Sequence, residues 1–331
     1  AASDVYKRQV LAAIRDIVDQ FQTAAIYITH DLAVVAQMAD TIKVLLKGEE
    51  VEEAPTEEML DHPQEDYTKS LWAVRSFKRP QVNRPTDGTP PVISVKGIDA
   101  AYTGGIKVLD DVSFDIYPGM TVAVVGESGS GKSTTARVIT GLLPPSKGEV
   151  LFKGEPLPAS YKDRTRDQLR QAQMIYQMAD TALNPKVRIS EIIGRPAEFY
   201  SGLKGPALKQ RVDELLDLIE LDPAKYYNRY PPELSGGQKQ RIGIARALAA
   251  QPDFIICDEV TSALDQLVAE GILKLLDRLQ QELGLAYMFI THDLATVRSI
   301  ADEAVVMQNG KVVEQGPKEE MFQPPHHRYT D

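Results

Sequence analysis

The sequence has little of several features that would define other classes of protein. One cysteine, Cys257, in 331 residues excludes an internal disulfide framework and is typical of a reducing compartment. No apolar run approaches the roughly 18 residues of a membrane-spanning helix, and we find no signal peptide. Lys and Arg number 37 against 47 Asp and Glu, and the net charge of -10 argues against a protein that binds nucleic acid. We expect a cytoplasmic α/β protein of about two domains, since 43% of its residues are hydrophobic.

The most informative feature is a six-residue segment that occurs twice. ITHDLA stands at 28–33 and again at 290–295, an offset of 262 residues. The same offset, without gaps, aligns Asp40 with Asp302, Gly48 with Gly310, Pro55 with Pro317, EEM at 57–59 with EEM at 319–321, and Tyr67-Thr68 with Tyr329-Thr330. Residues from about 14 to 68 are therefore predicted to repeat those from about 276 to 330. A strand-to-helix motif used twice is the less favoured explanation, because a gapless period of this length indicates a duplicated domain.

The repeat predicts the domain organisation. Some 180 residues of domain precede the second copy, but only about a dozen precede the first. We expect 1–70 to be the C-terminal remnant of a first domain in an N-terminally truncated chain, and 92–331 to be a second, nearly complete domain. Residues 1–9 fit the repeat poorly and are expected to lie outside the fold. Residues 71–91 contain four prolines and are expected to form an extended, semi-flexible linker.

A phosphate-binding loop is the strongest chemical signal. In VAVVGESGSGKSTT, 122–135, a β-rich run precedes Gly126, four further residues and Gly131-Lys132-Ser133, and a helical pattern follows. Glycines let backbone N–H groups point at phosphates, Lys132 adds a cation for the β- and γ-phosphates, and Ser133 offers a hydroxyl to Mg²⁺. A glycine-rich surface turn is the disfavoured alternative.

Two further motifs complete a nucleotide site. In DFIICDEVTSALD, 253–265, the run from Phe254 to Cys257 predicts a buried parallel strand that ends in Asp258-Glu259. Carboxylates there could hold hydrated Mg²⁺ and deprotonate an attacking water, although alone they would suit a solvated loop. In ELSGGQKQRIGIARALAA, 233–250, a serine and two glycines open a helix, which is either a second phosphate cradle or an ordinary N-cap.

Together and in this order, GESGSGKST, LSGGQ, FIICDE, SALD and ITHDLA resemble the nucleotide-binding domain of ABC ATPases. The resemblance covers essentially all of 92–331 and the repeat at 14–68. It implies an α/β fold of the P-loop NTPase class, ABC type, with a mostly parallel sheet core, an antiparallel β subdomain and a helical subdomain. It also implies hydrolysis of ATP to ADP and phosphate, with ATP and Mg²⁺ as cofactors.

The resemblance also implies roles for individual residues. Tyr102 resembles the aromatic residue that stacks on adenine, and Gln177 the glutamine that contacts Mg²⁺ and the attacking water. Asp258 resembles the Mg²⁺-site aspartate, Glu259 the general base, and His292 the switch histidine at the γ-phosphate. By themselves, Tyr102 could be an exposed loop aromatic and His292 a structural histidine.

The complete implied set falls into three groups. The implied catalytic residues are Lys132, Gln177, Glu259 and His292, and the implied metal ligands are Ser133, Gln177 and Asp258. Nucleotide contacts are implied for Tyr102, Gly126, Glu127, Ser128, Gly129, Ser130, Gly131, Lys132, Ser133, Thr134, Ser235, Gly236, Gly237, Gln238 and the interface-loop residue Asp265.

Pairing of domains explains why ITHDLA occurs twice. The resemblance implies that two such domains form a head-to-tail dimer, in which each ATP lies between the P-loop of one domain and the LSGGQ segment of the other. Two domains in tandem then carry two switch histidines, His30 and His292. The implied partner is a second ABC nucleotide-binding domain, in cis in the full-length protein or in a homodimer.

Four segments narrow the resemblance to the dipeptide/oligopeptide/nickel importer branch. They are YPPELSGGQKQRIGIARAL at 230–248, QMADTALNP at 177–185, HPQEDYTKSL at 62–71 and PPHHRYT at 324–330. The chain departs from the branch at Asp66 and Arg328, where proline is typical, and at Val260, where proline usually follows Asp-Glu. The implied function is to power import of a solute, peptide-like in this branch, from the cytoplasmic face of the bacterial inner membrane. The implied partners are integral membrane permease subunits and a separate solute-binding protein.

The alternative is a soluble tandem ABC ATPase that acts on the ribosome. Such proteins carry a long charged helical linker and basic surfaces, whereas this linker is short and proline-rich and the net charge is -10. A regulatory binder that never hydrolyses ATP is disfavoured because Glu259 and His292 are both present. We therefore favour the importer ATPase, with no nucleic-acid partner.

Overall fold

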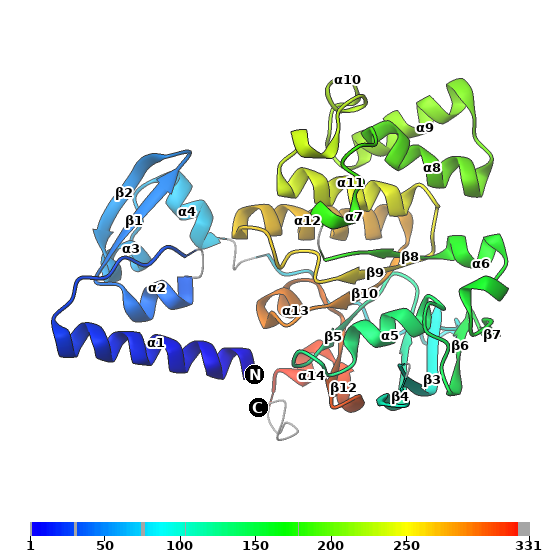
Figure 1. The fold of residues 1–331 in the computed structure, drawn as a ribbon, viewed down its shortest axis with the longest axis horizontal. Helices are drawn as coiled ribbons and strands as arrows, with labels where there is room; N and C mark the ends of the chain where they lie inside the picture. The colour runs from blue at the N-terminus through cyan, green and yellow to red at the C-terminus, as the bar shows by residue number, and fades with distance from the viewer. Residues whose placement is uncertain (1, 30–31, 74–76, 103, 178, 324–331) are drawn as a thin grey trace. The chain divides into compact units, whose positions relative to one another are not determined.

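The computed structural model describes residues 2–29, 32–73, 77–102, 104–177 and 179–323 (Figure 1). The chain divides into two compact units, one of residues 1–77 with 265–270 and the other of residues 78–264 with 271–331. Across these described ranges, no helix has both the length and the apolar character that crossing a membrane requires.

The first unit is built around a two-stranded antiparallel hairpin. Its elements are α1 (Ala2–Phe21), α2 (Leu32–Met38), β1 (Thr41–Leu46), β2 (Glu49–Pro55), α3 (Thr56–Asp61) and α4 (Asp66–Ala73). A small core packs against the hairpin and includes the buried side chains of Ile42, Val44 and Met59. Residues 2–9, which we expected to lie outside the fold, belong to α1, and residues 71–73, which we expected to open the linker, end α4.

The predicted repeat is visible in the hydrogen-bond register. In the first unit Thr41 pairs with Pro55, and in the second unit Glu303 of β11 (Glu303–Gln308) pairs with Pro317 of β12 (Lys311–Pro317), at the offset of 262 residues. Both hairpins also shift register at matching positions. The likeness extends further than the sequence indicated, because α1 ends at Phe21 and α12 (Gln266–Leu283) ends at the corresponding Leu283.

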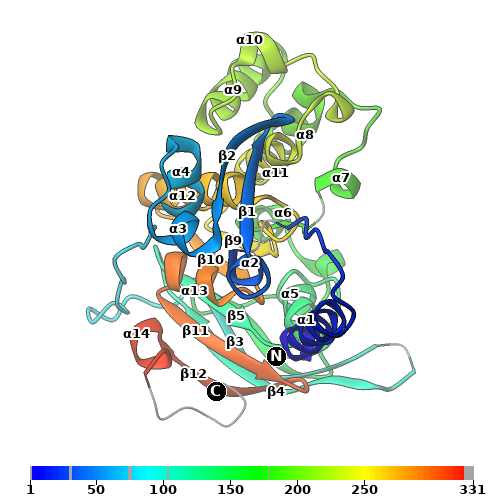
Figure 2. The same ribbon diagram turned by 90° about the vertical axis from the view of Figure 1, so that its left-hand side faces the viewer.

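Two sheets form the core of the second unit. The larger has the order β12-β11-β5-β10-β9-β8 and is parallel except for β12, and the smaller has the antiparallel order β4-β3-β6-β7. The strands not yet given are β3 (Ile93–Ala101), β4 (Lys107–Ile116), β5 (Thr121–Val125), β6 (Lys147–Phe152), β7 (Glu155–Pro156), β8 (Ala172–Ile175), β9 (Phe254–Asp258) and β10 (Ala286–Ile290). Figure 2 turns the view by 90° and shows β5, β11 and β12 close to β3 and β4.

Strand β5 shows how the two faces of the larger sheet are covered. Side chains alternate between faces along a strand. Val122 and Val124 belong to the core shared with the antiparallel sheet, whereas Ala123 and Val125 belong to a second cluster. That second cluster contains residues of α13 (Leu294–Ile300) and α14 (Lys318–Met321). Burial on both faces explains why all five residues of β5 are apolar or fully buried.

The helices of the second unit complete the architecture. A helical region follows β8 and contains α7 (Ala179–Ala182), α8 (Ile189–Ser201), α9 (Gly205–Leu218), α10 (Pro223–Tyr226), the 3₁₀ turn Pro231–Glu233 and α11 (Gly236–Leu248). The remaining helices are α5 (Lys132–Ile139), the 3₁₀ turn Tyr161–Asp163 and α6 (Arg166–Gln171). The predicted fold class is therefore confirmed in each part: parallel core, antiparallel β subdomain and helical subdomain.

The linker differs from the semi-flexible spacer that its prolines predict. Residues 77–91 contain no helix or strand, as expected of an extended segment. However, the side chain of Arg79 is buried, the backbone N–H of Val82 donates to Asp302, and Arg84 forms an ion pair with Glu303. Specific polar contacts, which proline content does not reveal, hold this part of the chain on the second unit.

Candidate functional site

The P-loop connects β5 to α5 through a backbone that only glycine tolerates. Gly126 has φ +153°, and a Cβ atom there would lie 2.2 Å from the carbonyl oxygen of Met307. Gly131 has φ +108° and caps α5, and a Cβ atom there would lie 2.7 Å from the side chain of Leu109. These glycines allow the loop to curl tightly between strand and helix, so that the first N–H groups of α5 are left to bind an anion.

Lys132 is a buried cation that its own loop holds in place. Its Nζ donates to the carbonyl oxygens of Gly126 (2.7 Å) and Glu127 (2.8 Å), and the residue is only 7% exposed. Burial lowers the pKa of Lys132, while the nearby carboxylates of Glu259 and Asp258 oppose that shift. These hydrogen bonds end on neutral oxygens, so an anionic phosphate would offer the ammonium a stronger partner.

Asp258 and Ser133 supply oxygen ligands beside the P-loop. Asp258 ends β9, where burial and then the neighbouring Glu259 raise its pKa, and a hydrogen bond from Ser133 counteracts this shift. A carboxylate and a hydroxyl are ligands that Mg²⁺ accepts, and Mg²⁺ is usually held by one or two protein groups together with phosphate oxygens. The described residues contain no group of three or more His, Cys, Asp or Glu that could hold a metal ion by itself. The donor set therefore fits a magnesium ion that a nucleotide shares.

Glu259 is the point on which three elements converge. Its backbone has φ +48°, and its N–H donates to the carbonyl oxygen of Ile290 at the end of β10 (2.9 Å). Gln177 Nε2, just after β8, donates to Glu259 Oε2 (2.8 Å), and His292 Nδ1, just after β10, lies 3.4 Å from Glu259 Oε1. Because β8, β9 and β10 are parallel neighbours, their carboxyl ends bring these three side chains together.

Tyr102 lies in the loop after β3 and touches the first turns of α5. Its hydroxyl is 3.2 Å from Thr134 Oγ1 and accepts a hydrogen bond from Arg137 Nη1 (3.2 Å). The guanidinium of Arg137 also lies over the ring, 5.8 Å from the ring centre. Tyr102 remains 37% exposed, so its ring is available for stacking next to the P-loop helix.

The LSGGQ segment begins α11. Ser235 is its N-cap, and its side chain and that of Gln238 form a reciprocal capping box. Gln238 Nε2 also donates to the hydroxyl of Tyr226 (2.9 Å). Ser235 and Gly236 are exposed at this helix N-terminus, so their backbone groups are accessible to a ligand presented from outside the unit.

The other sequence-predicted residues make few contacts or lie outside the described residues. Asp265 is exposed and accepts a hydrogen bond from the Val268 N–H (3.0 Å) at the start of α12. Ser128 and Gly129 are exposed in the P-loop, whereas Ser130 is buried. His30, the predicted first switch histidine, lies outside the described residues.

Sequence reasoning missed Ser262 and Arg137. Ser262 Oγ donates to the Glu259 carbonyl oxygen (3.0 Å) and lies 3.4 Å from Gln177 Nε2, so it joins the Glu259 cluster. The only signal was its place three residues after Glu259, in SALD. Arg137 lies one helical turn after Ser133, and nothing in the sequence distinguishes it from an ordinary surface arginine.

Comparison with known proteins agrees with this geometry. A family model described as ABC transporter matches residues 109–262. The glutathione import ATP-binding protein GsiA of Salmonella typhimurium is 36% identical over 357 aligned residues, and that of Escherichia coli K12 is 36% identical over 356. The alignments include 97% of this chain, and the chain spans 57% of the length of these relatives.

Solved structures match the fold. The structure of cbiO1 from Clostridium perfringens, part of the ABC transporter complex cbiONQ, has a TM-score of 0.64 and 30% identity, covering 70% of this chain and 91% of its own. A dimeric ATP-binding cassette in a post-hydrolysis state, bound to ADP and Pi, has a TM-score of 0.60 and 31% identity. The match covers 68% of this chain and 98% of that structure's chain. With its P-loop, its Asp-Glu strand and its LSGGQ helix in one unit, this chain belongs to the ATP-binding family of ABC transporters.

Proposed function

We propose that the second unit binds and hydrolyses ATP. The observation that carries this proposal is the convergence of Gln177 and His292 on Glu259, next to the P-loop. A carboxylate held on both oxygens is oriented to accept a proton from water. Lys132 and the N–H groups at the start of α5 bind the β- and γ-phosphates, and Ser133 and Asp258 would hold Mg²⁺. When bound, Mg²⁺ would neutralise phosphate charge.

We further propose that hydrolysis requires a second nucleotide-binding domain. Ser235 and Gly236 are exposed at the N-terminus of α11, which is the arrangement expected of a half-site that completes another domain's ATP site. The internal repeat supports a tandem arrangement in the full-length protein. Two copies of this chain could substitute for it.

The transport role rests on relatives and on a groove. The relatives with 36% identity are named for glutathione import, which supports a small peptide-like solute imported at the inner face of the membrane. Such an ATPase needs permease subunits, and a separate solute-binding protein would deliver the solute. The chain itself supplies the ATPase part of that assembly.

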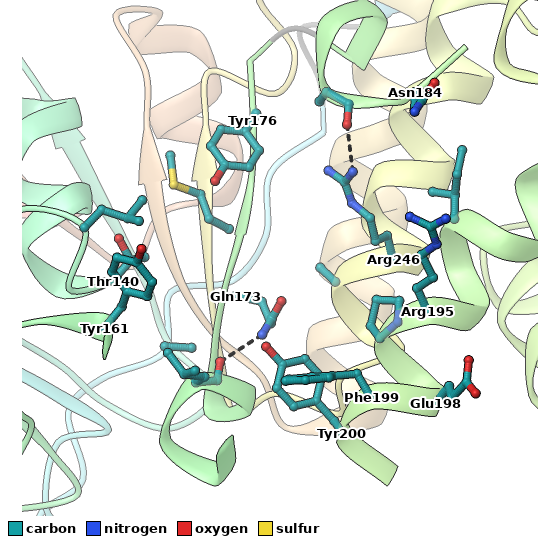
Figure 3. A pocket seen from close by; sticks show the side chains of 18 of the residues that line it. Thr140, Tyr161, Gln173, Tyr176, Asn184, Arg195, Glu198, Phe199, Tyr200 and Arg246 are labelled. Carbon is teal, nitrogen blue, oxygen red and sulfur yellow. Dashed lines mark hydrogen bonds between the residues drawn. The ribbon is translucent and has the colours of Figure 1, made fainter. Parts of the chain in front are cut away.

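The groove that we assign to the permease has a volume of about 960 Å³, and its lining includes Tyr176, the residue that precedes Gln177 (Figure 3). Its lining comes mainly from β8, α8 and α11 and the segments next to them, and it includes Tyr176, Phe199 and Arg246. Phe199 is 51% exposed and Tyr176 45%, an unusual exposure for aromatic side chains. Burial lowers the pKa of Arg246, whose Nη1 donates to the Ala182 carbonyl oxygen. We expect a short permease helix with apolar and acidic side chains to dock here, where movement of Tyr176 would reach Gln177 directly.

Site-specific cross-linking tests this assignment. Phe199→Cys should form a disulfide or short cross-link with a co-expressed permease, whereas Glu214→Cys, on α9 outside the groove, should not. The background is low because Cys257 is fully buried and burial raises the pKa of its thiol. Cross-links to ribosomal proteins instead, with none to permease, would overturn the importer assignment and leave the ATPase assignment to be judged by turnover.

A further inference from the structure

The second unit contains a buried polar pocket that the nucleotide chemistry does not use. It lies where β5 and β11 begin, at the end of the parallel sheet opposite the P-loop. Thr121 opens β5, Asp302 immediately precedes β11, and Gln280 belongs to α12; all three are buried. Thr121 and Gln280 bond each other through their side chains (3.1 Å), and the Thr121 N–H donates to Asp302 Oδ2 (2.7 Å). The acceptors are therefore held in fixed positions by the fold.

Arg79 of the linker fills this pocket. Its Nη2 donates to Asp302 Oδ2 (2.9 Å) and to the Gly119 carbonyl oxygen (3.1 Å). Its Nη1 donates to Gln280 Oε1 and to Thr121 Oγ1 (3.2 Å). Its Nε lies 3.5 Å from Asp277 Oδ1. A planar guanidinium with five N–H donors matches such an array, which the three donors of a lysine ammonium do not.

Further hydrogen bonds fix the backbone around Arg79. The Arg79 N–H donates to the Ser299 carbonyl oxygen (2.9 Å), and the Val82 N–H donates to Asp302 Oδ1 (2.7 Å). Asp302 therefore binds the side chain of one linker residue and the backbone of another. Arg84 adds a two-pronged contact to Glu303 (2.6 and 2.9 Å) over the ring of Tyr117.

The internal repeat shows that burial of Asp302 is not a property of its hairpin. Asp40 occupies the matching position before β1, and the carbonyl oxygens of both aspartates accept an equivalent bond from the start of the following helix. Asp40 is nevertheless exposed, whereas Asp302 is 0% exposed. Only the second of these equivalent carboxylates is covered by a guanidinium, so the linker contributes to the difference.

We infer that this pocket is a guanidinium-binding site occupied in cis by Arg79, and that residues 78–84 form a strap of the second unit rather than a free spacer. The strap ties β5, β11 and α12 together at the base of the sheet. Arg79 reaches the pocket from the linker. The stability of this end of the nucleotide-binding unit therefore depends on residues that precede its first strand.

Substitution of Arg79 tests the strap in the full chain. Arg79→Ala removes the guanidinium from a buried ion pair, a loss that should lower the Tm of the second unit by about 10 °C. Arg79→Lys keeps the positive charge but loses the planar guanidinium, and its Tm should lie between those of the wild type and Arg79→Ala. The matched control is Arg84→Ala, which breaks a half-exposed ion pair and should lower Tm by only about 2 °C.

Chemical rescue identifies the pocket as a guanidinium site. Millimolar guanidinium chloride should raise the Tm of Arg79→Ala towards the wild-type value, while neutral, planar urea at equal concentration should not. Neither compound should raise the Tm of the wild-type chain, because Arg79 already occupies the site. Equal shifts of both proteins, or no loss of Tm in Arg79→Ala, would overturn the assignment.

Hydrogen exchange in the wild-type chain decides the matter even if Arg79→Ala does not fold. The amides of Arg79 and Val82 should exchange at least about 100-fold more slowly than unprotected amides, as strand amides of a stable unit do. In folded Arg79→Lys their protection should fall while that of the β10 amides is retained. Unprotected exchange at Arg79 and Val82 in the wild type would refute the strap.

Discussion

At the scale of single residues, the geometry of Glu259 combines backbone strain with placement. A non-glycine residue at φ +48° is costly, by about 1–3 kcal/mol, and persists only where its surroundings fix it. Here the Glu259 N–H is held by Ile290, and the side chain by Gln177 and His292. The two adjacent acids therefore have different partners: Gln177 and His292 contact Glu259, whereas Ser133 donates to Asp258.

Glu259→Gln should reduce ATP turnover by about 10²–10⁴-fold, because glutamine keeps the shape but cannot accept the proton from water. ATP binding should change little. Steady-state phosphate release measures the first effect and equilibrium binding of ATP the second. Glu149→Gln, an exposed carboxylate on β6, is the matched control and should leave turnover unchanged. Near-normal turnover in Glu259→Gln would remove the base assignment.

Lys132→Ala should affect binding rather than only turnover. A charge-assisted bond to phosphate contributes about 1.5–3 kcal/mol, which corresponds to roughly a 10- to 150-fold loss of ATP affinity. Calorimetric titration with ATP and Mg²⁺ measures the loss. The control is Lys147→Ala, since that side chain is 79% exposed on the antiparallel sheet. An unchanged affinity for Lys132→Ala would contradict the phosphate cradle.

At the scale of elements, the strand-loop-helix unit from β5 to α5 depends on two different properties of glycine. Gly129 needs only its conformational freedom, since its φ is +82° and a Cβ atom would meet nothing within 4 Å. Gly126 needs space as well, because a Cβ atom there would overlap the backbone of β11 at Met307. The sequence motif shows both as glycine and does not separate them.

Gly126→Ala and Gly129→Ala should therefore differ sharply in stability. Gly129→Ala should cost about 1 kcal/mol of unfolding free energy, the strain of a left-handed alanine. Gly126→Ala should cost about 3 kcal/mol, because β11 must move to relieve the overlap. Denaturant unfolding of the two variants measures the difference. Equal costs would mean that the close approach of the P-loop to β11 is wrong.

At the scale of the whole molecule, the proposed function assigns two different halves of an ATP site to the second unit. The P-loop half includes Lys132, and the signature half begins at the exposed Ser235. If each ATP needs one half from each of two units, hydrolysis requires association. Specific activity should then rise with protein concentration and fall when Ser235 is replaced by a bulky residue.

Mixing two inactive variants tests shared sites directly. Lys132→Ala chains and Ser235→Arg chains should each be nearly inactive alone. Their heterodimer should regain about one of its two sites, because the intact P-loop of one chain meets the intact signature of the other. The readout is phosphate release as a function of mixing ratio. Activity that is independent of concentration, together with no recovery on mixing, would exclude the shared-site mechanism for this chain.

The two copies of one segment show how far a local pattern reaches. Residues 286–290 form β10, where Met288 and Ile290 are fully buried between β5 and β9. The corresponding residues 24–28 form no strand, and Ile26 and Ile28 are 93% and 97% exposed. Strand-forming residues need neighbouring strands, and the first unit contains only β1 and β2 in its described part. The same sequence pattern therefore forms a strand at 286–290 and none at 24–28.

The sequence by itself determined the elements whose cause is local. The P-loop glycines, the Asp-Glu end of β9, the capped start of α11 and the hairpin repeat follow from residue type and spacing over a few positions. Only the tertiary structure decided which distant residues meet. Gln177 and His292 reach Glu259 because parallel strands end at one edge of the sheet. Arg79 is buried because β5, β11 and α12 present their acceptors at one place, 40 to 223 residues away along the chain. Such contacts depend on how the layers pack, which no short window of sequence records.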